Sequence, residues 1–257
     1  MKVAADFRRE AREALRGKWP IAVLVGLIAT LLGATGKGFD IEIEKTATSA
    51  DFGLNFAGTR IFSRGVATAD SAYIESFMTG TVMYLVVIAI ILMVVQFIIG
   101  NVVAIGYAKY NMDLVDGEEG KMGTLFDYFP QWKTMVLAGF LQILIVFAGM
   151  LLFIIPGIVL GLRYAMTSYI LAENPDLGAW EAMKRSKELM DGNKYRFFCL
   201  GVSFLGWSIL ANLVPAIGQL FLMPYINASH AAFYRDVTRP LAGEEDTVFL
   251  QETILSE

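Results

Sequence analysis

The chain has little of the material from which catalytic and metal sites are usually built. Among its 257 residues there is one cysteine, Cys199, and one histidine, His230. A single cysteine excludes a disulfide framework and a cysteine-based metal site, and a single histidine removes most imidazole chemistry. We therefore expect no catalytic residue, no metal and no cofactor.

Charged residues are also scarce, at 18% of the chain, against about a quarter in soluble domains. Hydrophobic residues reach 56%, and the mean hydropathy is +0.54. A soluble chain of this length has too much surface to cover with so few charges. Several apolar runs are long enough to lie in a bilayer. The sequence predicts an all-α integral membrane protein, and a net charge of −4 without a basic domain argues against nucleic acid as a partner.

The apolar runs predict six transmembrane helices in a single polytopic domain, 1–257. Two breaks, "IPG" at Ile155–Gly157 and "VPAIG" at Val214–Gly218, turn the chain back because proline removes a backbone donor. The fourth and sixth spans are near the lower length limit, so re-entrant hairpins are the alternative at those two places. The predicted spans are about 20–34, 82–110, 134–155, 158–171, 197–214 and 219–234.

Lysine and arginine predict the orientation. They gather before the first span, after the second and fourth spans, and after the sixth, and with six spans all of these segments lie on one side. The loop on the other side, 35–80, has four basic residues against six acidic ones. By the positive-inside rule, the N- and C-termini are cytoplasmic. The charged lead without a clear cleavage site favours a retained anchor over a signal peptide.

The outer loop, 35–80, has strand-like character. Phe39–Glu44 alternates apolar and acidic residues, and Leu54–Phe62 is also strand-like, with glycine-rich turns between them. These patterns predict a small β-hairpin outside the membrane. A flexible spacer is the alternative for an insertion of this composition.

A water-compatible stretch, "NPDLGAWEAMKRSKELMDGNK" (174–194), interrupts the apolar sequence. From Ala179 onward, its apolar and charged residues fall on opposite sides of a helix. Gly178 fits the N-cap, and Gly192 stands where a glycine ends a helix. The stretch therefore predicts an amphipathic helix along the cytoplasmic leaflet. Its apolar face comprises Ala179, Ala182, Met183, Ser186, Leu189 and Met190.

The N-terminus repeats this design. Val3, Phe7, Ala11, Ala14 and Leu15 share one helical face, and arginines share the other. A shorter segment at 123–133 has the same order of amphipathic turn, breaker, aromatic and cation before a span. We interpret the chain as three copies of amphipathic helix, span, span, with the outer loop inserted in the first. The alternative is chance likeness, since many membrane proteins place aromatics and cations at the inner interface.

Two motifs suggest chemistry but lack its requirements. "GATGKG" (33–38) has neither the glycine spacing nor the Ser or Thr of a phosphate-binding loop. "DGEEG" (116–120) clusters carboxylates without further ligands, so we interpret it as a solvated turn.

Polar residues inside the predicted spans are the best site candidates, because such groups face the bundle interior or a wet cavity. Arg163 has no acidic residue in any span to pair with. It either neutralises an anionic ligand or lipid phosphate, or binds carbonyls and amides freed near the "IPG" break. His230 fits an interior hydrogen-bonding role better than a proton relay. The candidate contacts for an anionic ligand or lipid are Arg163, Gln142, Asn212, Asn227 and His230.

The basic faces of the amphipathic helices indicate the partner. Clustered cations at the cytoplasmic side attract anionic lipid headgroups, and a protein partner in the membrane is a further possibility. The residues of this interfacial basic face are Lys184, Arg185, Lys187, Arg8, Arg12 and Arg16. The predicted function is a non-catalytic membrane protein of assembly, scaffolding or lipid-associated type. The alternative is a transporter or permeability factor for an anionic or amphiphilic substrate that uses Arg163 and the polar span residues.

Several motifs carry a resemblance to a known family. They are "L-x-G-x-W" at Leu15–Trp19, the "IPG…RY" turn, "ILAENP", "A-x-K-R-S-x-E-L-M-x-G" at Ala182–Gly192, and "AAFYRD" at Ala231–Asp236. With these, the chain resembles the integral membrane proteins of Gram-positive bacteria grouped as domain of unknown function 975. Its central block also looks like the membrane domain of some glycerophosphodiester phosphodiesterases, without their catalytic domain. The resemblance implies a bacterial plasma membrane location and transfers no catalytic residue.

Overall fold

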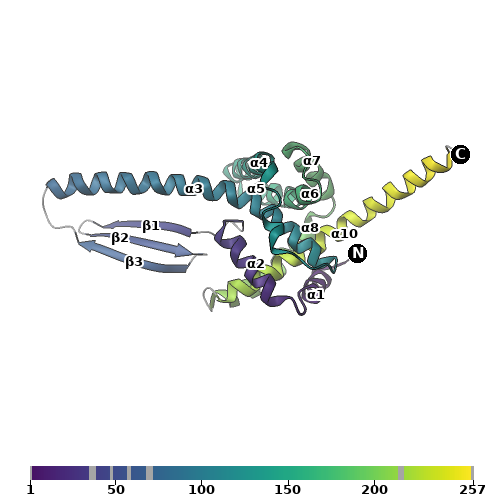
Figure 1. Cartoon of the computed structure of the whole chain (residues 1–257), viewed down its shortest axis with the longest axis horizontal. Coiled ribbons are helices and arrows are strands. Elements are labelled where there is room, and N and C mark those ends of the chain that lie inside the picture. The colour runs from purple at the N-terminus through teal and green to yellow at the C-terminus, as the bar shows by residue number, and fades with distance from the viewer. Residues whose placement is uncertain are drawn as a thin grey trace.

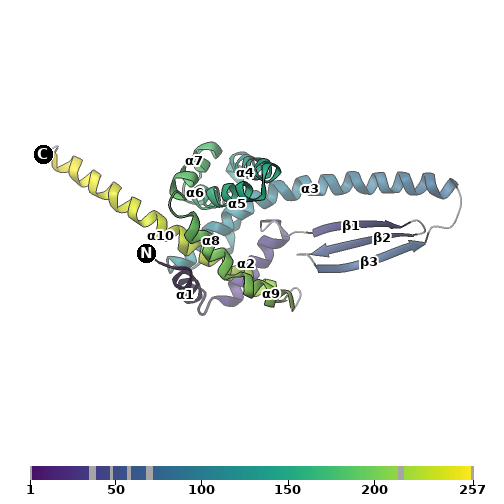
Figure 2. The same ribbon diagram turned by 180° about the vertical axis from the view of Figure 1, so that it is seen from behind.

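A computed structural model describes residues 2–34, 39–46, 49–56, 59–67, 72–213 and 217–255. Helices make up most of it, as predicted. A compact helical centre lies between two projections: the first half of α3 with the sheet on one side, and the end of α10 on the other (Figures 1 and 2). The helices are α1 (Ala4–Ala14), α2 (Trp19–Leu31), α3 (Ala72–Val115), α4 (Trp132–Leu152), α5 (Ile154–Arg163), α6 (Thr167–Glu173), α7 (Ala179–Leu189), α8 (Lys194–Ser203), α9 (Leu205–Leu213) and α10 (Ile217–Leu255), with 3₁₀ turns η1 (Met122–Leu125) and η2 (Phe129–Gln131).

Three strands, rather than the single predicted hairpin, lie in the outer loop. The strands β1 (Phe39–Thr46), β2 (Ser49–Phe56) and β3 (Thr59–Ala67) form an antiparallel sheet in the order β1-β2-β3. β2 pairs with both neighbours, with an irregularity between Leu54 and Asn55. The sequence prediction missed a strand because the predicted second strand, 54–62, runs across the end of β2 and the start of β3.

Six spans were predicted, and this number is wrong for the described helices. Three segments are long and apolar enough to cross a membrane: Val86–Val115, Met122–Leu152 and Ile154–Glu173. A fourth is reached only if α1 and α2, which meet at a 105° bend, count as one span. The 13 residues of α2 rise only about 20 Å at 1.5 Å each, against a hydrocarbon core of about 30 Å.

The two spans of the third predicted repeat are not membrane-spanning helices in the described structure, for a different reason. Its first span is split into α8 and α9, of 10 and 9 residues, on either side of Phe204. The start of α10, predicted as the sixth span, carries Gln219, Asn227, Ser229 and His230, which lower its hydropathy. The helices α8 and α9 are therefore too short to cross a membrane, and the start of α10 is not apolar enough.

The turn between α4 and α5 lies earlier than predicted. Phe153 has extended backbone angles (φ −162°, ψ 151°), and it separates the two helices. Pro156 lies inside the first turn of α5, where its missing N–H costs nothing because that donor has no helical partner. The returning helix packs closely on α4: a Cβ on Gly157 would lie 2.3 Å from Cγ of Met150. The "IPG" motif therefore starts the returning helix, and the break itself lies at Phe153.

Two clusters of fully buried side chains form the core. One includes Phe7, Met112, Ile170 and Phe233, and the other includes Leu15 and Tyr107. Both lie in the helical centre, away from the exposed apolar parts of α3, α4 and α5. Leu151 and Ile155 there are 80% and 75% exposed. The core is thus built at one end of the long helices, and their other end presents hydrocarbon outward.

The apolar faces of α1 and α7 pack on protein, not on a lipid leaflet. All six predicted face residues of α7 are buried, and so are Phe7, Ala11 and Leu15 of α1. Val3, assigned to the same face, is 61% exposed because it precedes the helix as its N-cap. The periodicity identified the buried faces, but amphipathicity has the same pattern whether lipid or protein covers a face.

Gly17 and Gly192 end α1 and α7 with the same backbone angle, φ +79°. This left-handed conformation disfavours residues with a Cβ, although the space around both glycines is open. We expect Gly17→Ala and Gly192→Ala each to lower the free energy of unfolding by about 1 kcal/mol, measured by thermal unfolding in detergent. Gly178→Ala, where φ is −65° and the space is also open, is the control. Equal effects at all three positions would contradict the conformational explanation.

Candidate functional site

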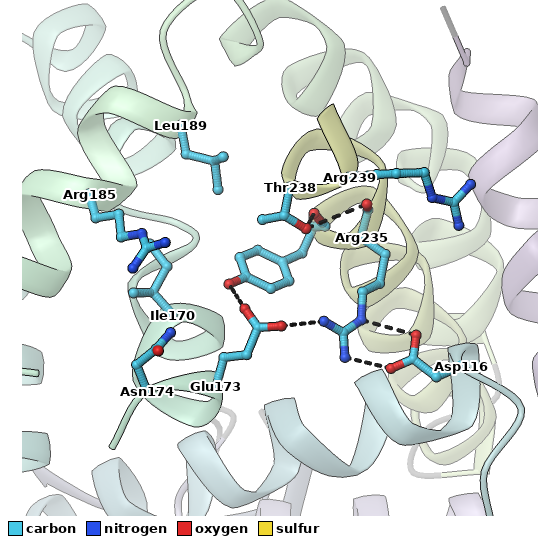
Figure 3. A pocket seen from close by; sticks show the side chains of 10 residues that line it. Asp116, Ile170, Glu173, Asn174, Arg185, Leu189, Arg235, Thr238 and Arg239 are labelled. Atoms are coloured by element: carbon cyan, nitrogen blue, oxygen red, sulfur yellow. Dashed lines mark hydrogen bonds and ion pairs between the residues drawn. The ribbon is translucent and has the colours of Figure 1, made fainter. Parts of the chain in front are cut away.

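The ends of two helices, α3 and α6, meet the middle of α10 at one place in the helical centre. α3 packs against both α6 and α10. Asp116 directly follows α3, Glu173 is the last residue of α6, and Arg235 lies on α10. Gly117, with φ +87°, ends α3 directly after Asp116. The three side chains point toward one another (Figure 3), so segments that are far apart in the sequence share one ionic cluster.

Arg235 is the centre of this cluster. Its Nε donates to Oδ1 of Asp116 at 3.0 Å, and its Nη2 donates to Oδ2 at 2.5 Å. Its Nη1 donates to Oε1 of Glu173, whose Oε2 accepts a 2.5 Å hydrogen bond from the hydroxyl of Tyr234. Partial burial alone would lower the pKa of Arg235, but the hydrogen bonds and negative charges of Asp116 and Glu173 raise it. All four carboxylate oxygens are therefore engaged.

A cavity of about 460 Å³ adjoins the cluster. Two further arginines line it, Arg185 from α7 and Arg239 from α10 (Figure 3), and no ion pair joins either of them to an acidic residue in the part of the chain that the structure describes. Three guanidinium groups against two carboxylates leave the cavity with a net positive charge. Its lining residues are Asp116, Ile170, Glu173, Asn174, Arg185, Leu189, Tyr234, Arg235, Thr238 and Arg239.

The segment that leads each predicted repeat packs on the helix that closes the preceding repeat. η1 contacts α3, α7 contacts α6, and α1 contacts α10. Each closing helix also carries a buried tyrosine: Tyr110 in α3, Tyr169 in α6 and Tyr234 in α10. The rings of Tyr169 and Tyr234 stack at 5.5 Å. Because α1 leads the first predicted repeat and α10 closes the third, their contact joins the first repeat to the third.

α1 and α7 match in length, in how they end and in the spacing of their buried residues. Both have 11 residues, and both are followed by a glycine at φ +79° and then by a new helix that starts two residues later. Their fully buried positions have the same spacing. These are Phe7, Ala11 and Leu15 in α1, and Ala182, Ser186 and Met190 in α7.

A second ionic cluster fixes α1 to α8 and α10. Arg196 donates from Nη2 to Oδ2 of Asp236 at 2.6 Å and to the carbonyl of Lys2 at 3.1 Å. Its guanidinium carbon also lies 5.6 Å from the ring centroids of Phe7 and Phe233. These contacts hold the start of the chain against α8 and α10.

The predicted candidates Arg163 and Gln142 lie outside the cavity. Arg163, at the end of α5, accepts a 3.0 Å hydrogen bond from the hydroxyl of Ser186 at its carbonyl, and its Nε is buried without a partner. Gln142 is half-buried in α4. Ser186 belongs to α7, so Arg163 lies where α5 meets that helix.

The other three polar candidates are also outside the cavity. Asn212 is exposed, and its Oδ1 accepts a 3.2 Å hydrogen bond from Gln219. Asn227 donates to the carbonyl of Met223 at 2.9 Å within its own helix. His230 packs against the ring of Phe197 at 4.9 Å. None of the five candidates lines the described cavity.

The predicted basic face divides into two groups. Lys184, Lys187, Arg12 and Arg16 are exposed, and Arg8 is half-buried. Arg185 is also exposed, but its side chain lines the cavity instead of extending the outer face (Figure 3).

Sequence reasoning missed the central residues Asp116, Glu173 and Arg235. Each follows the buried tyrosine of its helix within six residues, but the spacing differs from one helix to the next. Asp116 was interpreted as part of a solvated turn because its partner lies 119 residues away. Among the described residues, no group of three or more His, Cys, Asp or Glu side chains could hold a metal ion.

The class of protein that fits the fold is set by the three long segments, which are apolar enough to cross a membrane and expose hydrocarbon side chains. Residues 133–240 match the family described as "Protein of unknown function (DUF975)", so the predicted family resemblance is confirmed over this part of the chain. No curated protein and no solved structure matches the chain. The comparisons give no support to the weaker likeness to glycerophosphodiester phosphodiesterases.

Proposed function

We propose that this chain is a non-catalytic integral membrane protein that associates with anionic lipids and supports assembly in a bacterial plasma membrane. The observation that carries the proposal is the division of its surface. Apolar side chains on α3, α4 and α5 face outward at one end, and exposed cations lie on α1 and α7 at the other end. Lipid acyl chains would contact the apolar surface, and anionic lipid headgroups would bind the cationic surface.

The proposed topology has both termini in the cytoplasm. Four crossings, counting the bent pair α1–α2 with the three long segments, return the chain to its starting side. The basic residues of α1, of the turn after α3 and of α7 then lie together, as the positive-inside rule requires. In this arrangement α8, α9 and the start of α10 form a hairpin that enters the membrane part way, which agrees with the exposure of Trp207 and Ile209 (51% and 74%).

The proposed architecture is a ring of three repeats. The matching α1 and α7, and the packing of each leading segment on the preceding closing helix, support this proposal. In the second repeat, the 3₁₀ turns η1 and η2 replace the leading helix. Such a ring suits a scaffold, and a protein partner in the membrane would dock on its outer apolar surface.

Neutralising the basic face tests the lipid association. We expect a variant with Arg12, Arg16, Lys184 and Lys187 changed to glutamine to retain at least tenfold less phosphatidylglycerol relative to phosphatidylcholine. Each cation near an anionic surface contributes up to about 1 kcal/mol, and about 1.4 kcal/mol already corresponds to tenfold. Native mass spectrometry of protein extracted from mixed vesicles measures the ratio. The control exchanges the same residues between arginine and lysine, which keeps the charge. An unchanged ratio in the glutamine variant would contradict the proposed lipid association.

A further inference from the structure

We infer that the cavity beside Arg235 binds a phosphate-bearing anion, with Arg185 as its principal contact. The inference deepens the proposed lipid-associated function, because the phosphate belongs either to a lipid headgroup or to a soluble compound. Both sources present the same tetrahedral anion to the cavity.

The sign of the cavity's charge selects an anion. The N–H groups of Arg235 donate hydrogen bonds to Asp116 and Glu173, and the second carboxylate oxygen of Glu173 accepts a hydrogen bond from the hydroxyl of Tyr234. Each carboxylate oxygen therefore already accepts a hydrogen bond, and the negative charge of both carboxylates is shared with Arg235. Arg185 has no acidic partner within the described residues, and it adds a free guanidinium to the cavity wall.

The arrangement of donors favours phosphate. A guanidinium group presents parallel N–H donors that match two oxygens of a phosphate. Arg185 enters from one side of the cavity above Asn174, whose amide can donate from the same side, and Arg239 lies at the opposite side (Figure 3). The hydroxyl of Thr238 already donates to the carbonyl of Tyr234 at 2.9 Å, so it is not needed for binding. Arg185 therefore contacts the phosphate directly, and Arg239 adds mainly to the positive field.

The cavity is large enough for more than a phosphate ion. Its volume of about 460 Å³ falls in the range of small-molecule sites, about 300 to 1,000 Å³. Leu189 and Ile170 form an apolar part of the lining, which suits the carbon skeleton attached to a phosphate. The cavity lies where the ends of α3 and α6 meet the middle of α10, so a bound anion would lie beside residues of all three proposed repeats.

The first experiment measures thermal unfolding of the full-length protein in detergent, titrated with inorganic phosphate against chloride at matched ionic strength. We expect phosphate to raise the unfolding temperature. Arg185→Gln should weaken its apparent affinity about tenfold, the effect of one lost charge-assisted hydrogen bond. Arg239→Gln should weaken it about threefold, as expected for a distant charge. Lys133→Gln, an exposed cation outside both the cavity and the basic face, is the control and should leave the phosphate affinity unchanged.

The second experiment separates the two sources with dioctanoyl phosphatidic acid and dioctanoyl phosphatidylcholine. A shift with phosphatidic acid that exceeds the phosphate shift and depends on Arg185 assigns the site to a lipid headgroup. Equal shifts assign it to soluble phosphate compounds. If neither phosphate nor phosphatidic acid acts through Arg185, the inference is wrong. The proposed function is tested separately, because loss of phosphatidylglycerol in the four-cation variant with an intact phosphate shift supports the basic face and the cavity independently.

Discussion

Replacing Arg235 with leucine is expected to lower the free energy of unfolding by about 2 kcal/mol, because it leaves two carboxylates side by side without their shared cation. A fully buried ion pair would lose more, but the side chains of Arg235, Asp116 and Glu173 are 23%, 36% and 37% exposed, so water screens part of the loss. Thermal unfolding in detergent measures the change. Arg235→Lys should lose less, because lysine keeps the charge but cannot reach both carboxylates with a planar fork.

The control for this prediction is Arg9→Leu. Arg9 is 64% exposed and, among the described residues, pairs only with Asp6 at 3.3 Å, so its loss should cost less than 0.5 kcal/mol, roughly the median of surface ion pairs. A triple variant that also changes Asp116 to Asn and Glu173 to Gln should recover most of the stability lost in Arg235→Leu. If the triple variant is as unstable as the single one, packing of the arginine stem rather than its charge explains the loss.

The sequence predicted helices better than it predicted what covers them. In α7, the periodicity identified all six buried residues, and the glycines at 178 and 192 marked both ends. The prediction that a lipid leaflet covers this apolar face was wrong, because the helices α4 and α6 pack against it. The sequence pattern is the same whether lipid or protein covers the face. Helix length was the other weak point: the runs that gave α2, α8 and α9 are apolar but too short to cross.

The candidate site was harder to predict for a physical reason. Arg163 was predicted as a site residue because it is a lone charge in an apolar run, which is a local feature of the sequence. Asp116 and Glu173 lie at helix ends and Arg235 directly follows the predicted sixth span, so charges are ordinary at all three positions. Only the folded chain brings them within hydrogen-bond distance. Pairings across 62 and 119 residues leave no periodic signal. Arg185 was included among the predicted cations, but only the packing of α7 on α6 turns it toward a cavity.

Both ionic clusters include residues of α10, but each cluster joins α10 to different helices. Tyr234 and Arg235 join α10 to α3 and α6, whereas Asp236 joins it to Arg196 of α8 and, more distantly, to Lys2 at 3.8 Å. Three consecutive residues of α10 therefore contact every proposed repeat. This explains how a short motif in the matched family region can organise parts of the chain that lie outside that region, including α1.

Phe7→Ala is expected to have the largest effect on the chain's stability. Phe7 is fully buried, packs edge-on against Phe233 at 5.3 Å and lies under the guanidinium of Arg196. Removing a buried phenyl ring costs about 3 kcal/mol or more, and here the loss falls on the contact that joins α1 to α10. We expect α1 to separate from the centre before the remaining helices unfold, which limited proteolysis near the N-terminus measures as faster cleavage.

Phe126→Ala provides the control, because it removes the same ring from a position that is 50% exposed and stacked only on Phe129. It should leave N-terminal cleavage unchanged. Arg196→Leu removes the cation above Phe7 while keeping an apolar surface, so it should accelerate cleavage less than Phe7→Ala does. If Phe7→Ala lowers the overall stability without faster N-terminal cleavage, α1 is not the segment that closes the ring, and the proposed order of the three repeats fails with it.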